Sequence, residues 1–147
     1  MKYYNTEFNI TEIKNGEHSL IAPFITEHWG SSMIVSKGKI FNSAELKGFI
    51  CKENNNIVGL ITYRIENNEC EIVSLNSTVE NRGLGTSLIN KMINHSRKNN
   101  YQRIWVMTTN DNTKAIRFYQ KRGFEWVGYY KDSIQKSKKS IKVTSCY

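Results

Sequence analysis

The sequence predicts an α/β (α+β) fold in which a mixed, mostly antiparallel sheet carries helices on both faces. Its 147 residues suffice for a single domain, 1–147, that buries a core of its own. In the N-terminal half, strand-like segments are joined by asparagine turns, which favours antiparallel hairpins. In the C-terminal half, strand and helix patterns alternate, which is typical of a sheet covered by helices.

The first elements in chain order are only weakly marked. Residues 2–9 have the composition of an edge strand, and residues 16–28 that of a helix which Pro23 restarts or kinks. Residues 33–41 alternate weakly around Gly38, so a short strand and a loop both remain open.

The next three strands are predicted over 49–52, 57–65 and 69–77. Asn54-Asn-Asn56 forms the first turn and Asn67-Asn68 a two-residue hairpin, because asparagine tolerates positive φ. Regular alternation along 69–77 places Cys70, Ile72 and Ser74 on one face and Glu71, Val73 and Leu75 on the other.

Helical spacing of apolar residues then predicts a helix over 83–98. A strand over 103–108 follows, the segment 110–112 supplies capping residues for a second helix, and that helix stops at Gly123. After a strand over 124–130, only residues 141–147 remain for a last strand. Either this strand is short or a second subunit completes the sheet edge.

A glycine turn, Gly83-Leu-Gly85, joins the strand 69–77 to the helix 83–98. Such a turn leaves unpaired N–H groups at a helix start, where the helix dipole adds about half a positive charge and an anion is favoured. No nucleoside-triphosphate loop is present, and Leu88 stands where a dinucleotide fingerprint needs its third glycine. The turn therefore predicts a site for another kind of phosphorylated ligand.

Two further segments follow the turn, Trp105-Val-Met-Thr-Thr-Asn-Asp-Asn112 and Ala115-Ile-Arg-Phe-Tyr-Gln-Lys-Arg-Gly-Phe124. In this order, over residues 48–130, the chain resembles the GNAT superfamily of N-acetyltransferases of the bacterial type. The family's pyrophosphate signature, Gln/Arg-x-x-Gly-x-Gly/Ala, falls on residues 80–85, with Glu80 in place of the usual basic or amide residue. The resemblance implies a sheet of six to seven strands, acetyl-CoA as co-substrate, and direct transfer of an acetyl group from the thioester to a primary amine.

The resemblance also implies where the cofactor binds. The strand backbone around 75–77 would pair with the pantetheine amides as an added strand does, and the N–H of Leu75 would stabilise the oxyanion. The main-chain amides of the glycine turn would hold the diphosphate. The residues assigned to the cofactor are Leu75, Asn76, Ser77, Asn81, Arg82, Gly83, Leu84, Gly85, Thr86, Asn110, Asn112, Phe118 and Tyr119. For Asn110 and Asn112, plain helix capping is an equal alternative.

Tyr119 and Glu71 are the candidate catalytic residues. Tyr119 matches the family position whose phenol faces the cofactor sulfur; because a phenol is a weaker acid than a thiol, it is a hydrogen-bond donor to the thiolate before it is a proton donor. The alternative is an aromatic residue of the core. Glu71 resembles the strand glutamate that takes the amine proton in the histone acetyltransferase branch; the alternative is a carboxylate in water or paired with Arg64.

The acceptor amine is not determined by the sequence. Trp29, Arg64 and Glu71 are the candidates for lining its site, and a small-molecule amine is favoured over a peptide amine. The alternative function is a CoA-binding module without catalysis, such as a sensor or partner domain.

The composition limits the kinds of binding partner that we expect for this chain. The net charge of +8 suits an anionic cofactor, and the basic run 136–142 lacks the aromatic interleaving of a nucleic-acid site. Without an apolar run of about 18 residues or a signal-peptide core, we expect no membrane partner and a cytoplasmic location. Cys51, Cys70 and Cys146 lack metal-ligand spacing and are expected to be reduced thiols, with no metal site. A homodimer remains open.

Overall fold

A computed structural model of the chain describes residues 8–29, 33–36, 39–79, 82–109, 111–135 and 138–145. Within these residues seven strands form one sheet in the order β1-β4-β5-β6-β7-β9-β8, and β2 and β3 pair separately. Only β6 and β7 run parallel among the described strand pairs, which confirms the predicted mixed, mostly antiparallel sheet. The strands are β1 (Ile10–Glu12), β2 (Met33–Ser36), β3 (Lys39–Asn42), β4 (Lys47–Glu53), β5 (Asn56–Glu66), β6 (Glu69–Ser77), β7 (Ile104–Thr109), β8 (Glu125–Gln135) and β9 (Lys138–Ser145).

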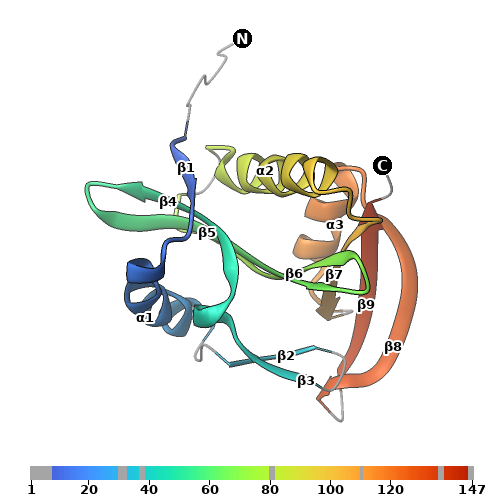
Figure 1. The fold of residues 1–147 in the computed structure, drawn as a ribbon. Helices are drawn as coiled ribbons and strands as arrows, with labels where there is room; N and C mark the ends of the chain where they lie inside the picture. Colours follow the sequence, from blue (N-terminus) through green and yellow to red (C-terminus); the bar gives the residue numbers. More distant parts are fainter. Residues whose placement is uncertain are drawn as a thin grey trace.

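Helices cover both faces of this sheet, as predicted (Figure 1). On one face, α1 (His18–Trp29) packs Ile21 and Ile25 against Ile50 and Leu60 of the sheet. On the other face lie α2 (Leu84–Lys98) and α3 (Thr113–Lys121), with two short 3-10 helices, η1 (Asn15–Glu17) and η2 (Ser43–Glu45), elsewhere in the chain. Pro23 lies inside α1.

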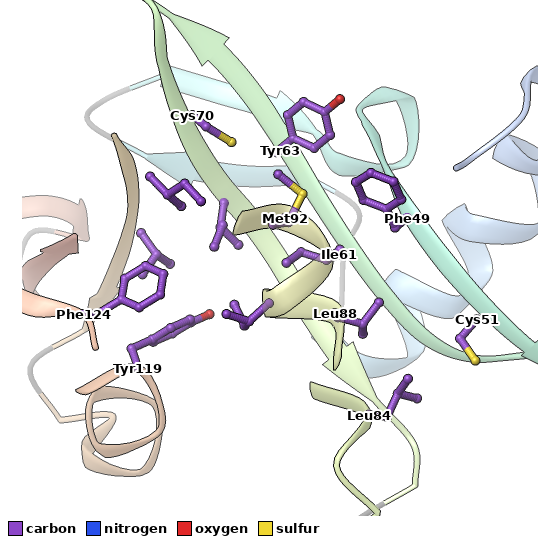
Figure 2. Close-up of a cluster of buried hydrophobic side chains, with 14 residues drawn as sticks. Phe49, Cys51, Ile61, Tyr63, Cys70, Leu84, Leu88, Met92, Tyr119 and Phe124 are labelled. Atoms are coloured by element: carbon purple, nitrogen blue, oxygen red, sulfur yellow. The ribbon is translucent and has the colours of Figure 1, made fainter. Parts of the chain in front are cut away.

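The larger core cluster lies under α2 (Figure 2). Leu84, Leu88, Ile89 and Met92 recur at helical spacing along α2, and each is almost fully buried. Burial of each such side chain contributes about 2 kcal/mol to folding. Tyr119 from α3 and Phe124 just before β8 close the same cluster at its other end.

Asparagine turns set the hairpins where the sequence predicts them. Asn54 and Asn55 have φ of 52° and 65°, and Asn67 and Asn68 have φ of 54° and 60°. This left-handed backbone matches the twist of two-residue hairpins and thus joins β4 to β5 and β5 to β6.

The C-terminal segment completes the sheet from within the chain. β9 begins three residues before the predicted start and pairs antiparallel with β7 through six residue pairs, from Ile104 with Ser145 to Thr109 with Ser140. β8 then pairs with the outer side of β9. No second subunit is needed to extend the described sheet beyond β7. Of the edge strand predicted over 2–9, residues 2–7 lie outside the described residues, and β1 begins at Ile10.

The predicted alternation along β6 is confirmed from Cys70 to Ile72 and is wrong beyond Val73, because the strand carries a β-bulge there. The register with β5 shifts between Thr62 and Tyr63, so that Thr62 pairs with Ser74 and Tyr63 with Ile72, and Val73 is the extra residue. Cys70 and Ile72 therefore share the α2 face with Leu75. On the opposite face, the hydroxyl groups of Ser74 and Thr62 form a hydrogen bond of 2.5 Å. Glu71 lies on this same face and pairs with Arg64.

Gly59 on β5 lets α2 lie directly on the sheet. A Cβ at this position would be 2.6 Å from Cδ2 of Leu84 and 3.2 Å from Cδ1 of Leu88. We expect Gly59→Ala to push the start of α2 outward and to lower the free energy of unfolding by about 1–3 kcal/mol, measured by urea denaturation. Gly16→Ala is the control, because a Cβ there meets no atom within 4 Å. Equal stabilities of the two variants would contradict this close packing.

Candidate active site

β6 and β7 separate after a short parallel pairing. They pair from Cys70 with Ile104 to Ile72 with Val106, and no later pair is formed between the described residues of the two strands. A cavity of about 210 Å³ lies in the gap, lined by β6 from Ile72 to Leu75, by β7 from Val106 to Thr108, and by α3. Main-chain groups in this gap are able to accept an extended ligand as a further strand.

A larger cavity of about 470 Å³ adjoins this gap between the end of β6, the start of α2 and one side of α3. Ten of its thirteen lining residues come from the bulged end of β6, the glycine turn and one face of α3: Leu75, Ser77, Gly83, Leu84, Gly85, Thr86, Asn112, Ala115, Phe118 and Tyr119. Val79, Lys114 and Arg122 complete the lining. The cavity therefore joins most of the predicted cofactor residues in one place.

The glycine turn forms a main-chain anion cradle at the start of α2. Gly83 caps the helix with φ 79°, a left-handed conformation that glycine adopts without strain. The first helical hydrogen bond runs from the N–H of Ser87 to the carbonyl of Gly83. The N–H groups of Leu84, Gly85 and Thr86 therefore lack an intrahelical acceptor, and all three residues line the cavity.

Tyr119 lies where the two cavities meet and lines both. The side chain is almost fully buried, and this burial raises the pKa of the Tyr119 phenol. Its hydroxyl forms no hydrogen bond with any described residue, and its oxygen is not fully buried. Tyr119 is thus both a core aromatic residue, packed on Phe124, and a residue of the cavity lining whose hydroxyl is available as a donor.

Asn112 has both of the roles considered for it in the sequence. Its side-chain oxygen accepts a hydrogen bond of 3.1 Å from the N–H of Ala115 and so caps α3. It also lines both cavities. Asn110 and Asn81 lie outside the described residues.

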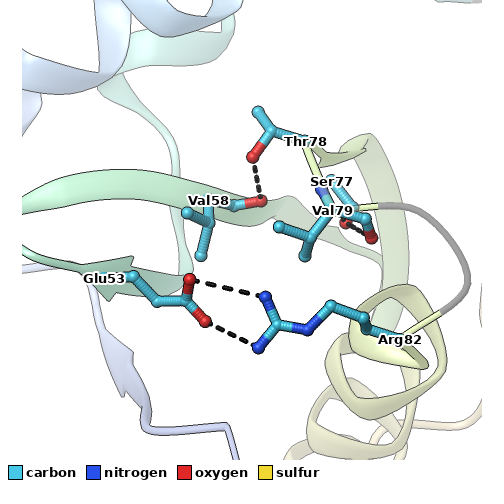
Figure 3. A network of polar contacts seen from close by, with 6 residues as sticks. All are labelled: Glu53, Val58, Ser77, Thr78, Val79 and Arg82. Carbon is cyan, nitrogen blue, oxygen red and sulfur yellow. Dashed lines mark hydrogen bonds and ion pairs between the residues drawn. The ribbon is translucent and has the colours of Figure 1, made fainter.

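Arg82 and Asn76 do not line either cavity. The guanidinium of Arg82 forms an ion pair with Glu53, at 2.9 Å from Nη2 to Oε1 (Figure 3). It also lies 5.3 Å from the ring centroid of Phe8. In the same view, Thr78 donates to the carbonyl of Val58 and so ties the end of β6 to β5. These contacts fasten the segment that enters the glycine turn.

Glu71 and Arg64 form a buried ion pair on the α1 side of the sheet. The distance from Arg64 Nε to Glu71 Oε1 is 2.5 Å, and Nη1 of the same guanidinium pairs with Glu66. Burial lowers the pKa of Arg64, but hydrogen bonds with Glu66 and Glu71 raise it more, so that the net pKa is above its usual value. Neither residue lines the two cavities, and the side chain of Trp29, the third predicted acceptor residue, is outside the described part of the structure.

Two positively charged side chains that line the larger cavity, those of Lys114 and Arg122, were not predicted from the sequence to belong to the site. Lys114 is exposed in the first turn of α3. Arg122 follows Phe118 by four residues, and this helical spacing is the signal that could have placed them together. Among the described residues, no group of acidic, histidine or cysteine side chains could hold a metal ion, and no helix is long and apolar enough to cross a bilayer.

Sequence similarity to known proteins extends over most of the chain. Residues 11–124 match the model of the acetyltransferase (GNAT) family. The protein YxbD of Bacillus subtilis (strain 168) is 41% identical to this chain over 121 residues, which cover 82% of this chain and 76% of YxbD.

Solved structures share the fold at low sequence identity. An N-acetyltransferase from Staphylococcus aureus Mu50 is similar with a TM-score of 0.78, over 96% of this chain and 98% of that one, at 18% identity. A GNAT family acetyltransferase from Elizabethkingia anophelis, solved with acetyl-CoA bound, is similar with a TM-score of 0.71 over 97% of this chain and 100% of that one, at 17% identity.

Proposed function

This chain belongs to the acetyltransferase (GNAT) family, and we propose that it transfers an acetyl group from acetyl-CoA directly to a primary amine. The observation that carries the proposal is the pair of adjoining cavities, one at the main-chain anion cradle of residues 84–86 and one in the gap between β6 and β7. A diphosphate suits the cradle, and the amides of an extended pantetheine suit the gap.

In this proposal Tyr119 and Leu75 act at the thioester. Both line the smaller and the larger cavity, so both lie at the junction of the cradle and the gap. The N–H of Leu75 stabilises the oxyanion of the tetrahedral intermediate. Tyr119 donates a hydrogen bond to the departing thiolate, and since burial raises its pKa, it remains protonated while it does so.

Glu71 is the proposed base for the amine proton, with Arg64 as its partner. The ion pair lies on the face of β6 opposite α2, and the acetyl group reaches this face through the gap beside Ile72 and Val73. An ammonium acceptor must lose one proton before its nitrogen attacks. Because Glu71 is buried and does not line the cavities, the proton reaches it through water.

The acceptor we propose is a small-molecule amine, with a peptide amine as the second choice. The proposal includes a cytoplasmic location, in keeping with the buried free thiols of Cys51 and Cys70. The alternative is a CoA-binding module without catalysis. The ion pair between Glu71 and Arg64 favours this alternative, because it gives Glu71 a structural role of its own.

Titration calorimetry of the full chain with acetyl-CoA tests the proposal. We expect saturable binding at micromolar ligand, and release of free thiol when a panel of primary amines is added. Gly83→Val should weaken binding at least about 10-fold, because a β-branched residue is strained at φ 79°. No binding at millimolar acetyl-CoA would refute the proposal, and binding without thiol release for any amine would favour the module without catalysis.

A further inference from the structure

Arg122 holds the two helices of the cavity together. Its Nε and Nη2 atoms both donate to the hydroxyl oxygen of Thr86 on α2, at 2.9 and 2.5 Å. Its Nη1 atom donates to the carbonyl of Phe118 at 2.8 Å, and the guanidinium lies 3.6 Å from the centroid of the Phe118 ring. Three of the five N–H donors of Arg122 are used in this way, and two are left over.

This guanidinium has no carboxylate partner among the described residues. Arg64, Arg82 and Arg103 each pair with a glutamate, whereas Arg122 is in no ion pair of the described part of the chain. It is half-buried on the wall of the larger cavity, and burial lowers its pKa. An arginine remains charged even so, and a half-buried charge without a counter-charge is costly unless an anion joins it.

Thr86 gains a directed donor from this contact. Its oxygen accepts two hydrogen bonds from Arg122, so both lone pairs are occupied and the hydroxyl hydrogen points away from the guanidinium. Thr86 lines the cavity, and its own N–H is the third of the unpaired amides of the cradle. Arg122 and Thr86 thus present N–H and O–H donors beside the main-chain amides.

We propose that Arg122 and Thr86 are the side-chain half of the diphosphate site, and that Arg122, at the C-terminal cap of α3, supplies the positive charge that Glu80 cannot supply at the family's usual position. The inference rests on the proposed function, since the diphosphate is that of CoA. Two features carry it independently of the cradle: the uncompensated charge of Arg122 and the fixed orientation of the Thr86 hydroxyl.

Calorimetric affinities of the full chain for CoA and for dephospho-CoA test this site. Dephospho-CoA lacks the 3′-phosphate but keeps the diphosphate. We expect Arg122→Gln to weaken both ligands by about 10- to 100-fold, the range for a charge-assisted hydrogen bond, and Thr86→Val by about 5-fold. Arg122→Lys, which keeps the charge, should recover part of the loss. Lys121→Gln is the control, because it removes the same charge from an exposed position of the same helix outside the cavity.

A purely structural role of Arg122 would give a different pattern. The wild-type affinity should fall with added salt, and this dependence should be weaker in Arg122→Gln, because fewer charges are then screened. A variant that only destabilised the packing of α3 would keep the salt dependence of the wild-type affinity. Unchanged affinity of Arg122→Gln, or a loss for CoA that is absent for dephospho-CoA, would overturn the inference. Failure of the wild-type chain to bind either ligand would refute the proposed function itself, and the inference with it.

Discussion

Tyr119→Phe is expected to lower kcat about 100-fold and to leave the affinity for acetyl-CoA nearly unchanged. Tyr119 lines both cavities and its hydroxyl has no partner among the described residues, so removal of the hydroxyl breaks no hydrogen bond within the described protein. A factor of 100 corresponds to about 2.7 kcal/mol of transition-state stabilisation, the usual worth of one donor to a developing anion. Thiol release under saturating acetyl-CoA and amine measures it.

Tyr63→Phe is the matched control for this change. Tyr63 is also buried, but its hydroxyl is bonded to Nε2 of His95 at 3.1 Å and lies away from the cavities. This variant should lose some stability and keep its kcat. Because burial raises the pKa of Tyr119, the pH–rate profile should show no fall at moderately alkaline pH from ionisation of this phenol. Equal kcat values for Tyr119→Phe and the wild type would remove Tyr119 from the mechanism.

Arg64→Met is expected to lower the free energy of unfolding by about 3 kcal/mol or more. Side-chain exposure is only 12% for Arg64 and 3% for Glu71, and removal of one partner takes the adjacent cation away from a buried carboxylate. Arg82→Met is the control, because the Arg82–Glu53 pair has side chains 40% and 41% exposed and should be worth at most about 1 kcal/mol. Urea unfolding of both variants measures the difference, and equal losses would contradict the buried role.

Glu71→Gln separates the structural role of this pair from the proposed chemical one. If Glu71 takes the amine proton, kcat of the folded variant falls, and the deficit shrinks as pH rises because more of the amine is already neutral in solution. A pair that serves stability alone leaves kcat unchanged at every pH at which the variant is folded. The double variant Glu71→Gln with Arg64→Met should lose less free energy of unfolding than the two single variants lose together, because neither charge then remains without its partner.

Features set by neighbouring residues could be predicted from the sequence. Positive φ at Asn67-Asn68, the apolar stripe from Leu84 to Met92, and the cap at Asn112 follow from local backbone preferences and from helical periodicity. For the same reason the cradle could be predicted, since its donors are main-chain amides that any sequence with this turn presents.

Other features depended on pairing between distant residues. The bulge at Val73 arises from the register between β5 and β6, and regular alternation gave no sign of it. The hydrogen bond between Arg122 and Thr86 joins residues that are 36 positions apart in the sequence. Arg82 was predicted to contact the cofactor, but its side chain pairs with Glu53 and does not line the larger cavity.

The sequence by itself thus determined the order of the elements, the turns and the anion-binding start of α2, because each depends on dihedral preferences and hydrophobic periodicity within a few residues. Only the tertiary structure decided which charges are paired, which face of β6 each side chain takes after Val73, and that Arg122 at the end of α3 reaches Thr86 of α2. Charges and hydrogen bonds act over a few ångströms in space, and chain separation does not reveal which groups folding brings that close.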